Sequence, residues 1–145
     1  MVFVSFTLVK TLIQKTAEAR RLRPYAPEGL MVLRGPGERY GEGSRWTLAD
    51  GHGFAEVELM RGSESLRPGT LYVENLEVKR EDRGMGHGEA LFLRVQGFAR
   101  NVGALWMQID SERDAVGFWL RVGFEETGRT FYGGKVSMIK RVPGR

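Results

Sequence analysis

The sequence predicts an α/β fold in which a strand, a glycine-rich turn and a helix follow one another at the centre of a mixed sheet. The strand covers residues 71–78, an apolar run interrupted by two glutamates and an asparagine. Glycines occupy three alternate positions in the turn, residues 83–88, and an amphipathic helix follows from Glu89. A second apolar strand at residues 104–109 is the natural parallel partner of the first, because a helix joins the two.

Composition indicates one globular domain spanning residues 1–145. Hydrophobic residues make up 41% of the sequence and charged residues 28%, and the chain is long enough to bury a core. The absence of cysteine excludes disulfides, thiolate metal ligands and a cysteine nucleophile. His52 and His87 are the only histidines, so we expect no histidine-rich metal site.

The charge balance favours anionic partners. Lysine and arginine number 22 against 18 acidic residues, a formal net charge of +4. A cofactor that carries several phosphates would satisfy this balance, and nucleic acid is the weaker alternative. No apolar run reaches membrane-spanning length, so we expect a cytoplasmic protein with no membrane partner. We further expect the protein to be a monomer or a homodimer.

The N-terminal half predicts a strand, a helix and then further strands. Residues 1–9 alternate apolar side chains and lack the basic start and cleavage site of a signal peptide, which favours a first strand. Residues 11–23 have helical periodicity and end before Pro24. Residues 30–33 are either a short strand or an extended linker, and the glycine-rich residues 35–43 form a loop.

A hairpin follows, with strands at residues 45–48 and 54–60. The turn between them is Asp50-Gly-His-Gly53, where His52 is more simply a turn residue than a catalyst. Strand alternation places Ala55, Val57 and Leu59 on the core face.

The C-terminal half predicts two helices and a closing hairpin. The central helix has apolar residues at helical spacing and stops at Gly103. Ser111 and Asp114 have the spacing of a capping box at the start of a helix that runs to Val122. Residues 124–132 and 135–141 form a hairpin around a two-residue turn, Gly133-Gly134.

The glycine turn has the character of an anion site. A strand that leads through glycines into a helix aims free backbone N–H groups and the helix dipole at a phosphate. The Walker motif is excluded because no Gly-Lys-Ser/Thr is present, and the dinucleotide motif because the glycines are spaced G-x-G-x-G. The pattern that fits is R-x-x-G-x-G, from Arg83 through Gly86 to Gly88, after a strand that ends at Val78.

This motif resembles the acyl-CoA pyrophosphate loop of the GCN5-related N-acetyltransferase (GNAT) superfamily. A second motif supports the resemblance, since residues 115–124, Ala-Val-Gly-Phe-Trp-Leu-Arg-Val-Gly-Phe, are similar to the family's A-x-x-F-Y-x-x-x-G-F. The resemblance covers roughly the last half of the chain. It implies the GNAT fold, a central mixed sheet whose two parallel strands splay apart and are flanked by helices.

The resemblance also implies acetyl-CoA, or another acyl-CoA, as cosubstrate and a primary amine as acceptor. Backbone N–H groups of the turn would hold the pyrophosphate, pantetheine would pair with the central strand, and the Leu76 N–H would face the thioester oxygen. The following helix would border the cofactor. The expected cofactor-binding residues are Leu76, Glu77, Val78, Arg83, Gly84, Met85, Gly86, His87, Gly88, Ala115 and Phe118.

Direct transfer to an amine requires a base, and the central strand offers one. The family places bases four or six residues before the valine at Val78, which points to Glu74 first and Tyr72 second. Uninterrupted alternation puts Tyr72, Glu74 and Leu76 on one face. A bulge in the strand would swap the faces and favour Glu77 or Asn75 instead.

One position departs from the family pattern. Trp119 stands where relatives commonly have a tyrosine that protonates the leaving thiolate, and an indole N–H is not a usable acid. We expect another donor, with Tyr132 first and Tyr72 or water as alternatives. Trp119 also favours the alternative that the protein is a degenerate module, which binds acyl-CoA without turnover. A further alternative is an acceptor that is a nucleic acid or a basic protein.

Overall fold

The computed structural model describes residues 26–35, 44–60, 67 and 69–144. The strand expected at residues 1–9 and the helix expected at residues 11–23 lie outside the described residues, as does most of the loop at 35–43. Within the described part, no helix is long and apolar enough to cross a membrane.

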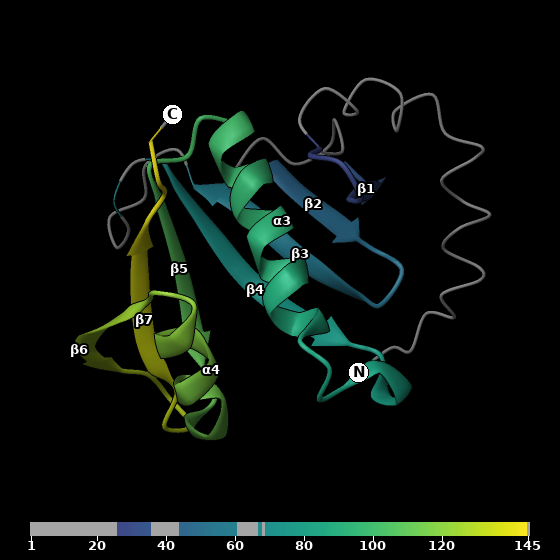
Figure 1. The fold of residues 1–145 in the computed structure, drawn as a ribbon. Coiled ribbons are helices and arrows are strands. Elements are labelled where there is room, and N and C mark those ends of the chain that lie inside the picture. Colours follow the sequence, from purple (N-terminus) through teal and green to yellow (C-terminus); the bar gives the residue numbers. More distant parts are fainter. Residues whose placement is uncertain (1–25, 36–43, 61–66, 68, 145) are drawn as a thin grey trace.

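The described elements form a seven-stranded mixed sheet with helices packed against it (Figure 1). The strand order is β1-β2-β3-β4-β5-β7-β6, in which only β4 and β5 run parallel. The strands are β1 (Met31–Arg34), β2 (Ser44–Ala49), β3 (Gly53–Met60), β4 (Thr70–Val78), β5 (Trp106–Ser111), β6 (Glu125–Thr130) and β7 (Val136–Arg141). The helices are α3 (His87–Asn101), α4 (Val116–Arg121) and the 3-10 turns η2 (Arg80–Asp82) and η3 (Arg113–Ala115).

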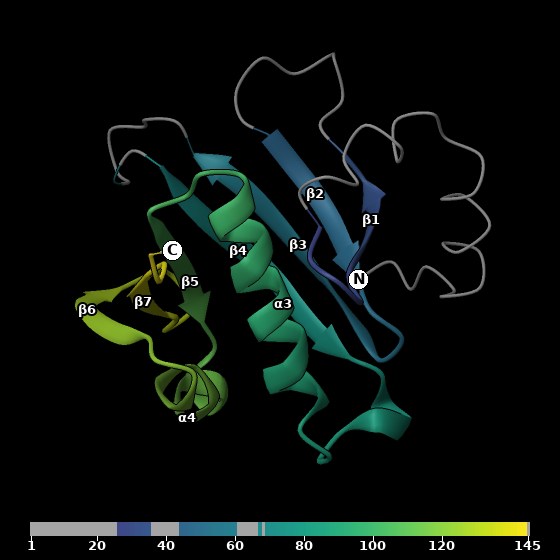
Figure 2. The same ribbon diagram turned by 45° about the horizontal axis from the view of Figure 1, so that its top comes forward.

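The main core lies between the sheet and α3, which crosses the face of β3 and β4 in both views (Figures 1 and 2). Leu91, Val95 and Phe98 are fully buried, as their spacing predicts. Phe92 makes edge-to-face contacts with Trp119 and Phe124, which join α3 to the C-terminal elements. The core face predicted for β3 is confirmed, because Ala55, Val57 and Leu59 are buried.

Both predicted glycine stops are confirmed. At the end of α3, the N–H of Ala104 donates to the carbonyl of Ala99, and Gly103 has a φ of +83°. The end of α4 repeats this arrangement around Gly123, whose φ is +98°. These bonds satisfy the last carbonyls of each helix, and the positive φ explains glycine at the two positions.

Two local predictions are wrong. The capping box does not form, because Ser111 Oγ donates to the carbonyl of Glu112 and η3 begins without a side-chain cap from the described residues. The closing hairpin has a longer turn than Gly133-Gly134 alone. The N–H of Phe131 donates to the carbonyl of Lys135, which leaves a three-residue loop of Tyr132, Gly133 and Gly134.

Candidate active site

The two parallel strands of the sheet pair over only four residues. The register runs from Thr70 opposite Trp106 to Val73 opposite Ile109. Beyond this point β5 continues beside β7, whereas β4 continues to Val78 beside β3 alone. Figure 1 shows β4 and β5 diverging toward the start of α3. The splay that the resemblance implies is therefore present, and β4 has an edge from Glu74 to Val78 without a described strand partner.

A bulge in β4 coincides with this fork. Val57 of β3 stands opposite Val73, but the next pair is Glu56 opposite Asn75, so Glu74 is an extra residue. The bulge that the sequence left open as an alternative is therefore present, and uninterrupted alternation is wrong. Leu76 packs against the same core as Leu71 and Val73 rather than sharing a face with Tyr72.

The ladder determines which backbone groups face the open edge. The N–H of Lys79 donates to the carbonyl of His52 at 2.8 Å, so this antiparallel pair is hydrogen-bonded. Hydrogen-bonded and non-bonded pairs alternate, and so Leu76 and Val78 direct their N–H and C=O groups away from β3. The Val78 carbonyl accepts a hydrogen bond from Arg83 Nε at 3.1 Å, which agrees with this direction.

The glycine turn leaves open space beside a helix start. Gly84 and Gly86 have φ near +80°, and an added Cβ at either would meet no described atom within 4 Å. Gly86 is the N-cap of α3 and supplies no side-chain cap. The first N–H groups of a helix have no intrahelical acceptor, so this end of α3 can receive an anion.

The exposed Arg83 side chain makes two contacts beside the turn. Its Nε donates to the Val78 carbonyl, and its guanidinium lies 3.7 Å from a carboxylate oxygen of Glu77. Across the fork, Phe118 approaches the start of α3, since a Cβ at Gly88 would lie 3.4 Å from its ring. Ala115, like Phe118, is half-buried.

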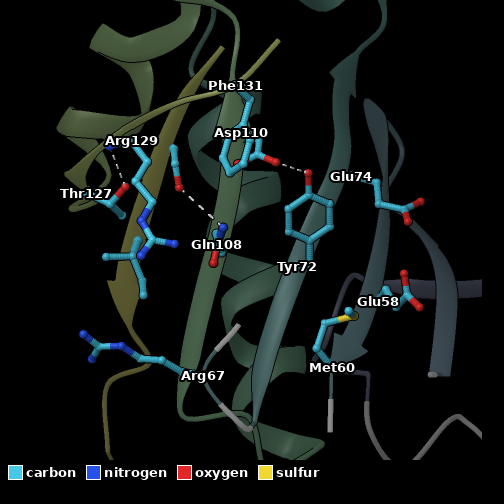
Figure 3. A pocket seen from close by; sticks show the side chains of 12 residues that line it. Glu58, Met60, Arg67, Tyr72, Glu74, Gln108, Asp110, Thr127, Arg129 and Phe131 are labelled. Carbon is cyan, nitrogen blue, oxygen red and sulfur yellow. Dashed lines mark hydrogen bonds between the residues drawn. The ribbon is translucent and has the colours of Figure 1, made fainter. Parts of the chain in front are cut away.

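A groove of about 750 Å³ lies on the sheet face opposite α3 (Figure 3). Strands β3, β4, β5, β6 and β7 all contribute to its walls. The lining residues are Glu58, Met60, Arg67, Tyr72, Glu74, Gln108, Asp110, Thr127, Arg129, Phe131, Ser137 and Ile139. The groove thus contains Glu74 and Tyr72, the two predicted base candidates.

Tyr72 and Asp110 bridge the strands at the fork. The Tyr72 hydroxyl donates to Asp110 Oδ2 at 2.6 Å, joining the last paired stretch of β4 to β5. Burial, together with this hydrogen bond to the carboxylate, raises the pKa of Tyr72 well above its usual range. Tyr72 is therefore a stable hydrogen-bond donor and a poor base at neutral pH.

Glu74 is the carboxylate whose environment favours proton uptake. Burial raises its pKa above the ordinary value, and Glu58 adds to the increase. Arg45 opposes the shift, because its guanidinium lies 3.3 Å from Glu74 and 3.1 Å from Glu58. Two carboxylates thus share one guanidinium, and the net effect is a carboxylate that is more basic than usual.

The other predicted proton carriers lie elsewhere. Tyr132 is fully exposed in the hairpin turn and does not line the groove. Glu77 faces Arg83, and neither Glu77 nor Asn75 lines the groove. Trp119 is 5% exposed and packs against Phe118 and Phe124, so it is a core residue.

Sequence reasoning missed ten of the twelve groove residues, among them Asp110, Arg129 and Arg67. Asp110 follows Gln108 at alternate spacing on β5, which was a usable signal for a shared face. The two arginines lacked such a signal, because Arg67 precedes β4 in a polar segment and Arg129 belongs to a strand whose residues are all exposed.

Comparison with solved structures finds the same fold in several acetyltransferases. PaiA N-acetyltransferase from Thermoplasma acidophilum, in complex with coenzyme A, is 17% identical with a TM-score of 0.52, and the match covers 67% of this chain and 59% of that one. YhbS from Escherichia coli, in complex with CoA, is 15% identical with a TM-score of 0.55 and coverage of 69% and 59%. Nourseothricin acetyltransferase is 20% identical with a TM-score of 0.55, and the match covers 89% of this chain and 96% of that one.

A search of curated proteins finds no match. The family model described as "Acetyltransferase (GNAT) domain" matches residues 52–140, a span that contains the fork, the glycine turn and α4. The chain therefore belongs to the GNAT acetyltransferase family.

Proposed function

We propose that the protein is an N-acetyltransferase that carries an acetyl group from acetyl-CoA to a primary amine by direct attack in a ternary complex. The observation that carries this proposal is the fork between β4 and β5. It joins an open strand edge and a glycine turn to a groove that contains carboxylates. The PaiA and YhbS structures, which share this fold, contain CoA.

The cosubstrate would follow the edge of β4. N–H groups of Gly84 through Gly88 would bind the pyrophosphate, aided by the dipole of α3. The Arg83 N–H of the predicted set already donates to the Arg80 carbonyl at 3.4 Å. Pantetheine amides would pair with the outward backbone groups of Leu76 and Val78, which lack a described strand partner. Phe118 and Ala115 would border the cofactor from the other side of the fork.

The chemistry requires one bond exchange and two proton movements. The amine nitrogen forms a bond to the acetyl carbon, the carbon–sulfur bond breaks, and the electron pair leaves on the CoA thiolate. The Leu76 N–H would stabilise the developing oxyanion, since it faces the open edge. Glu74 would accept the proton lost by the amine, directly or through a water, because its raised pKa suits a general base.

The thiolate would take its proton from water. Tyr72 lines the groove, but burial and its hydrogen bond to Asp110 raise its pKa, which makes it a poor proton donor to a thiolate. Trp119 gives little support to a degenerate binding module, because its place in the aromatic core explains its presence. A nucleic-acid acceptor has less support, because a groove lined by three carboxylates and two arginines matches a polyphosphate chain poorly.

Cofactor binding is tested by a matched pair of glycine variants. Gly86→Val should abolish the thermal stabilisation by acetyl-CoA, which for the parent amounts to about 2.7 kcal/mol at a ligand concentration near one hundred times Kd. Gly103→Val is the control, because Gly103 has a similar positive φ and equally open surroundings at the far end of α3. Both variants carry the same backbone strain, so loss of binding in both would contradict the assignment of the turn.

The role of Glu74 is tested by Glu74→Gln, which should lower kcat on the order of 10²-fold with little change in acetyl-CoA affinity. In the parent, kcat/KM should fall as the pH drops through the raised pKa of Glu74, because a base works only when deprotonated. That acidic limb should vanish in the variant. Glu126→Gln, an exposed change on β6, is the control. Parent-like rates in Glu74→Gln would transfer the role to bulk water.

A further inference from the structure

We propose that the acceptor carries an anionic group, a carboxylate or a phosphate, in addition to its amine. This inference rests on the proposed function and names the substrate class of the same groove. The groove separates its charges, with Glu58 and Glu74 on one side and Arg67 and Arg129 on the other (Figure 3). A molecule with one charge of each sign fits this arrangement better than a polyamine.

The acidic side has a counter-charge for only one of its two glutamates. Arg45 contacts both Glu58 and Glu74, and Tyr72 donates to one oxygen of Asp110. The other oxygen, Asp110 Oδ1, is buried and has no partner among the described residues. A buried acceptor without a donor is costly, so a water or an N–H donor that reached this oxygen would be stabilised there.

The basic side is not neutralised by carboxylates. Neither Arg67 nor Arg129 forms an ion pair with another described residue, and each is exposed enough to reach a ligand. The Arg67 guanidinium lies 4.4 Å from the ring centre of Trp106, which holds its position by a cation–π contact. An anion on this side of the groove would meet guanidinium groups, which suit both carboxylate and phosphate.

Arg67 and the fork lie near opposite ends of β5. Trp106, Gln108 and Asp110 share a face of β5, so Trp106 and Asp110 are separated by roughly 13 Å along the strand. Arg67 stands at the Trp106 end and the fork at the Asp110 end. An acceptor held at both ends must therefore be extended, with its amine and its anion separated by a chain.

The experiment compares matched acceptors at saturating acetyl-CoA. ω-Amino carboxylates of increasing length, and ω-amino phosphonates of the same lengths, are compared with n-alkylamines and α,ω-diamines. We expect kcat/KM at least tenfold higher for one of the anionic series, with an optimum in chain length. The series that gives the higher value identifies carboxylate or phosphate as the group recognised.

Variants of Arg129 make the test specific. Arg129→Gln should lower the preference for the anionic acceptor over the matched alkylamine, and Arg129→Glu should reverse it toward the diamine. Arg121→Gln, an exposed change on α4, should keep the parental preference. Equal turnover of alkylamines and anionic amines, or a preference unaffected by Arg129→Glu, would overturn the inference while leaving the acetyltransferase intact. Absence of turnover with every amine would instead refute the proposed function.

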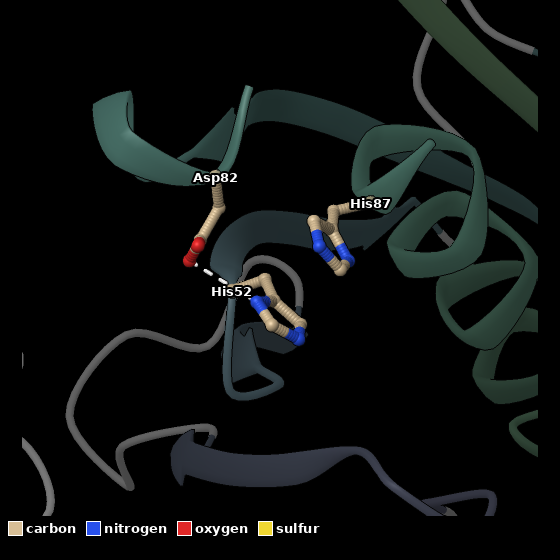
Figure 4. A group of neighbouring side chains, drawn as sticks. All are labelled: His52, Asp82 and His87. Atoms are coloured by element: carbon tan, nitrogen blue, oxygen red, sulfur yellow. Dashed lines mark hydrogen bonds and ion pairs between the residues drawn. The ribbon is translucent and has the colours of Figure 1, made fainter. Parts of the chain in front are cut away.

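A second proposal rests on a separate cluster, the only two histidines of the sequence. We propose that His52, His87 and Asp82 form a site for a divalent transition metal such as Zn²⁺. Their ligand atoms all lie within 4.8 Å of one another, and the three side chains come from different segments (Figure 4). His52 belongs to the β2–β3 turn, Asp82 to η2, and His87 to the first turn of α3.

The geometry needs a small rearrangement to bind an ion. His52 Nδ1 lies 3.1 Å from Asp82 Oδ2, and the two imidazole rings stack with centres 3.6 Å apart. Stacked rings cannot both direct a nitrogen at one ion, so one ring must rotate. The His52 side chain is 43% exposed, which leaves room for this rotation. Two imidazoles and one carboxylate are a common ligand set for Zn²⁺ and leave a fourth position open.

Untagged protein gives a clean test, because the sequence has no cysteine and no further histidine to bind the ion. Co²⁺ should bind with one equivalent, produce visible ligand-field absorption and be displaced by Zn²⁺. His52→Gln and His87→Gln should each weaken Co²⁺ binding at least tenfold, whereas Asp114→Asn, an exposed acidic control, should not. Co²⁺ affinity that is unaffected by either histidine change, or no saturable binding, would overturn the proposal.

Discussion

The early separation of β4 from β5 is the constraint on which the rest of the site depends. Their parallel pairing stops after Val73 and Ile109, although β4 continues to Val78 and β5 to Ser111. The extra residue Glu74 bends β4 at this point. Beside the last paired residues, the Tyr72 hydroxyl donates a hydrogen bond to Asp110. Backbone groups at a fork need partners, so an extended ligand with amide groups is the natural occupant of the edge.

Contacts with its neighbours hold the N-terminus of α3 beside the open edge of β4. Asp50, which is buried, accepts hydrogen bonds from the N–H groups of His52 and Gly53 with one oxygen and binds Arg94 of α3 with the other at 2.9 Å. The β2–β3 turn is thereby attached to the helix, and the aromatic contacts of Phe92 attach the helix to α4. The N-terminus of α3 is thus held at the open end of β4, where a phosphate-bearing ligand can use both.

Much of this arrangement could be predicted from local patterns. Glycine spacing after a strand identified the turn, and apolar periodicity identified the buried face of α3, because both signals depend on neighbouring residues. The bulge at Glu74 depends on the register with β3, so strand alternation alone misplaced Leu76. The Tyr72–Asp110 bond joins residues 38 positions apart, and the environment of Trp119 is set by helices that meet only in the fold. The position of Tyr132 in the closing hairpin suggests a proton donor to the thiolate, but the hairpin turn directs its side chain to solvent.

Amide hydrogen exchange of β4, with and without CoA, is the most direct test of the fork as the cofactor site. The account predicts that CoA protects the N–H groups of Leu76 and Val78 and those of residues 84–88. The N–H of Lys79, which already donates to His52, should change little. Saturating CoA that leaves Leu76 and Val78 unprotected would contradict the account, because the ligand would then bind without pairing to the open edge.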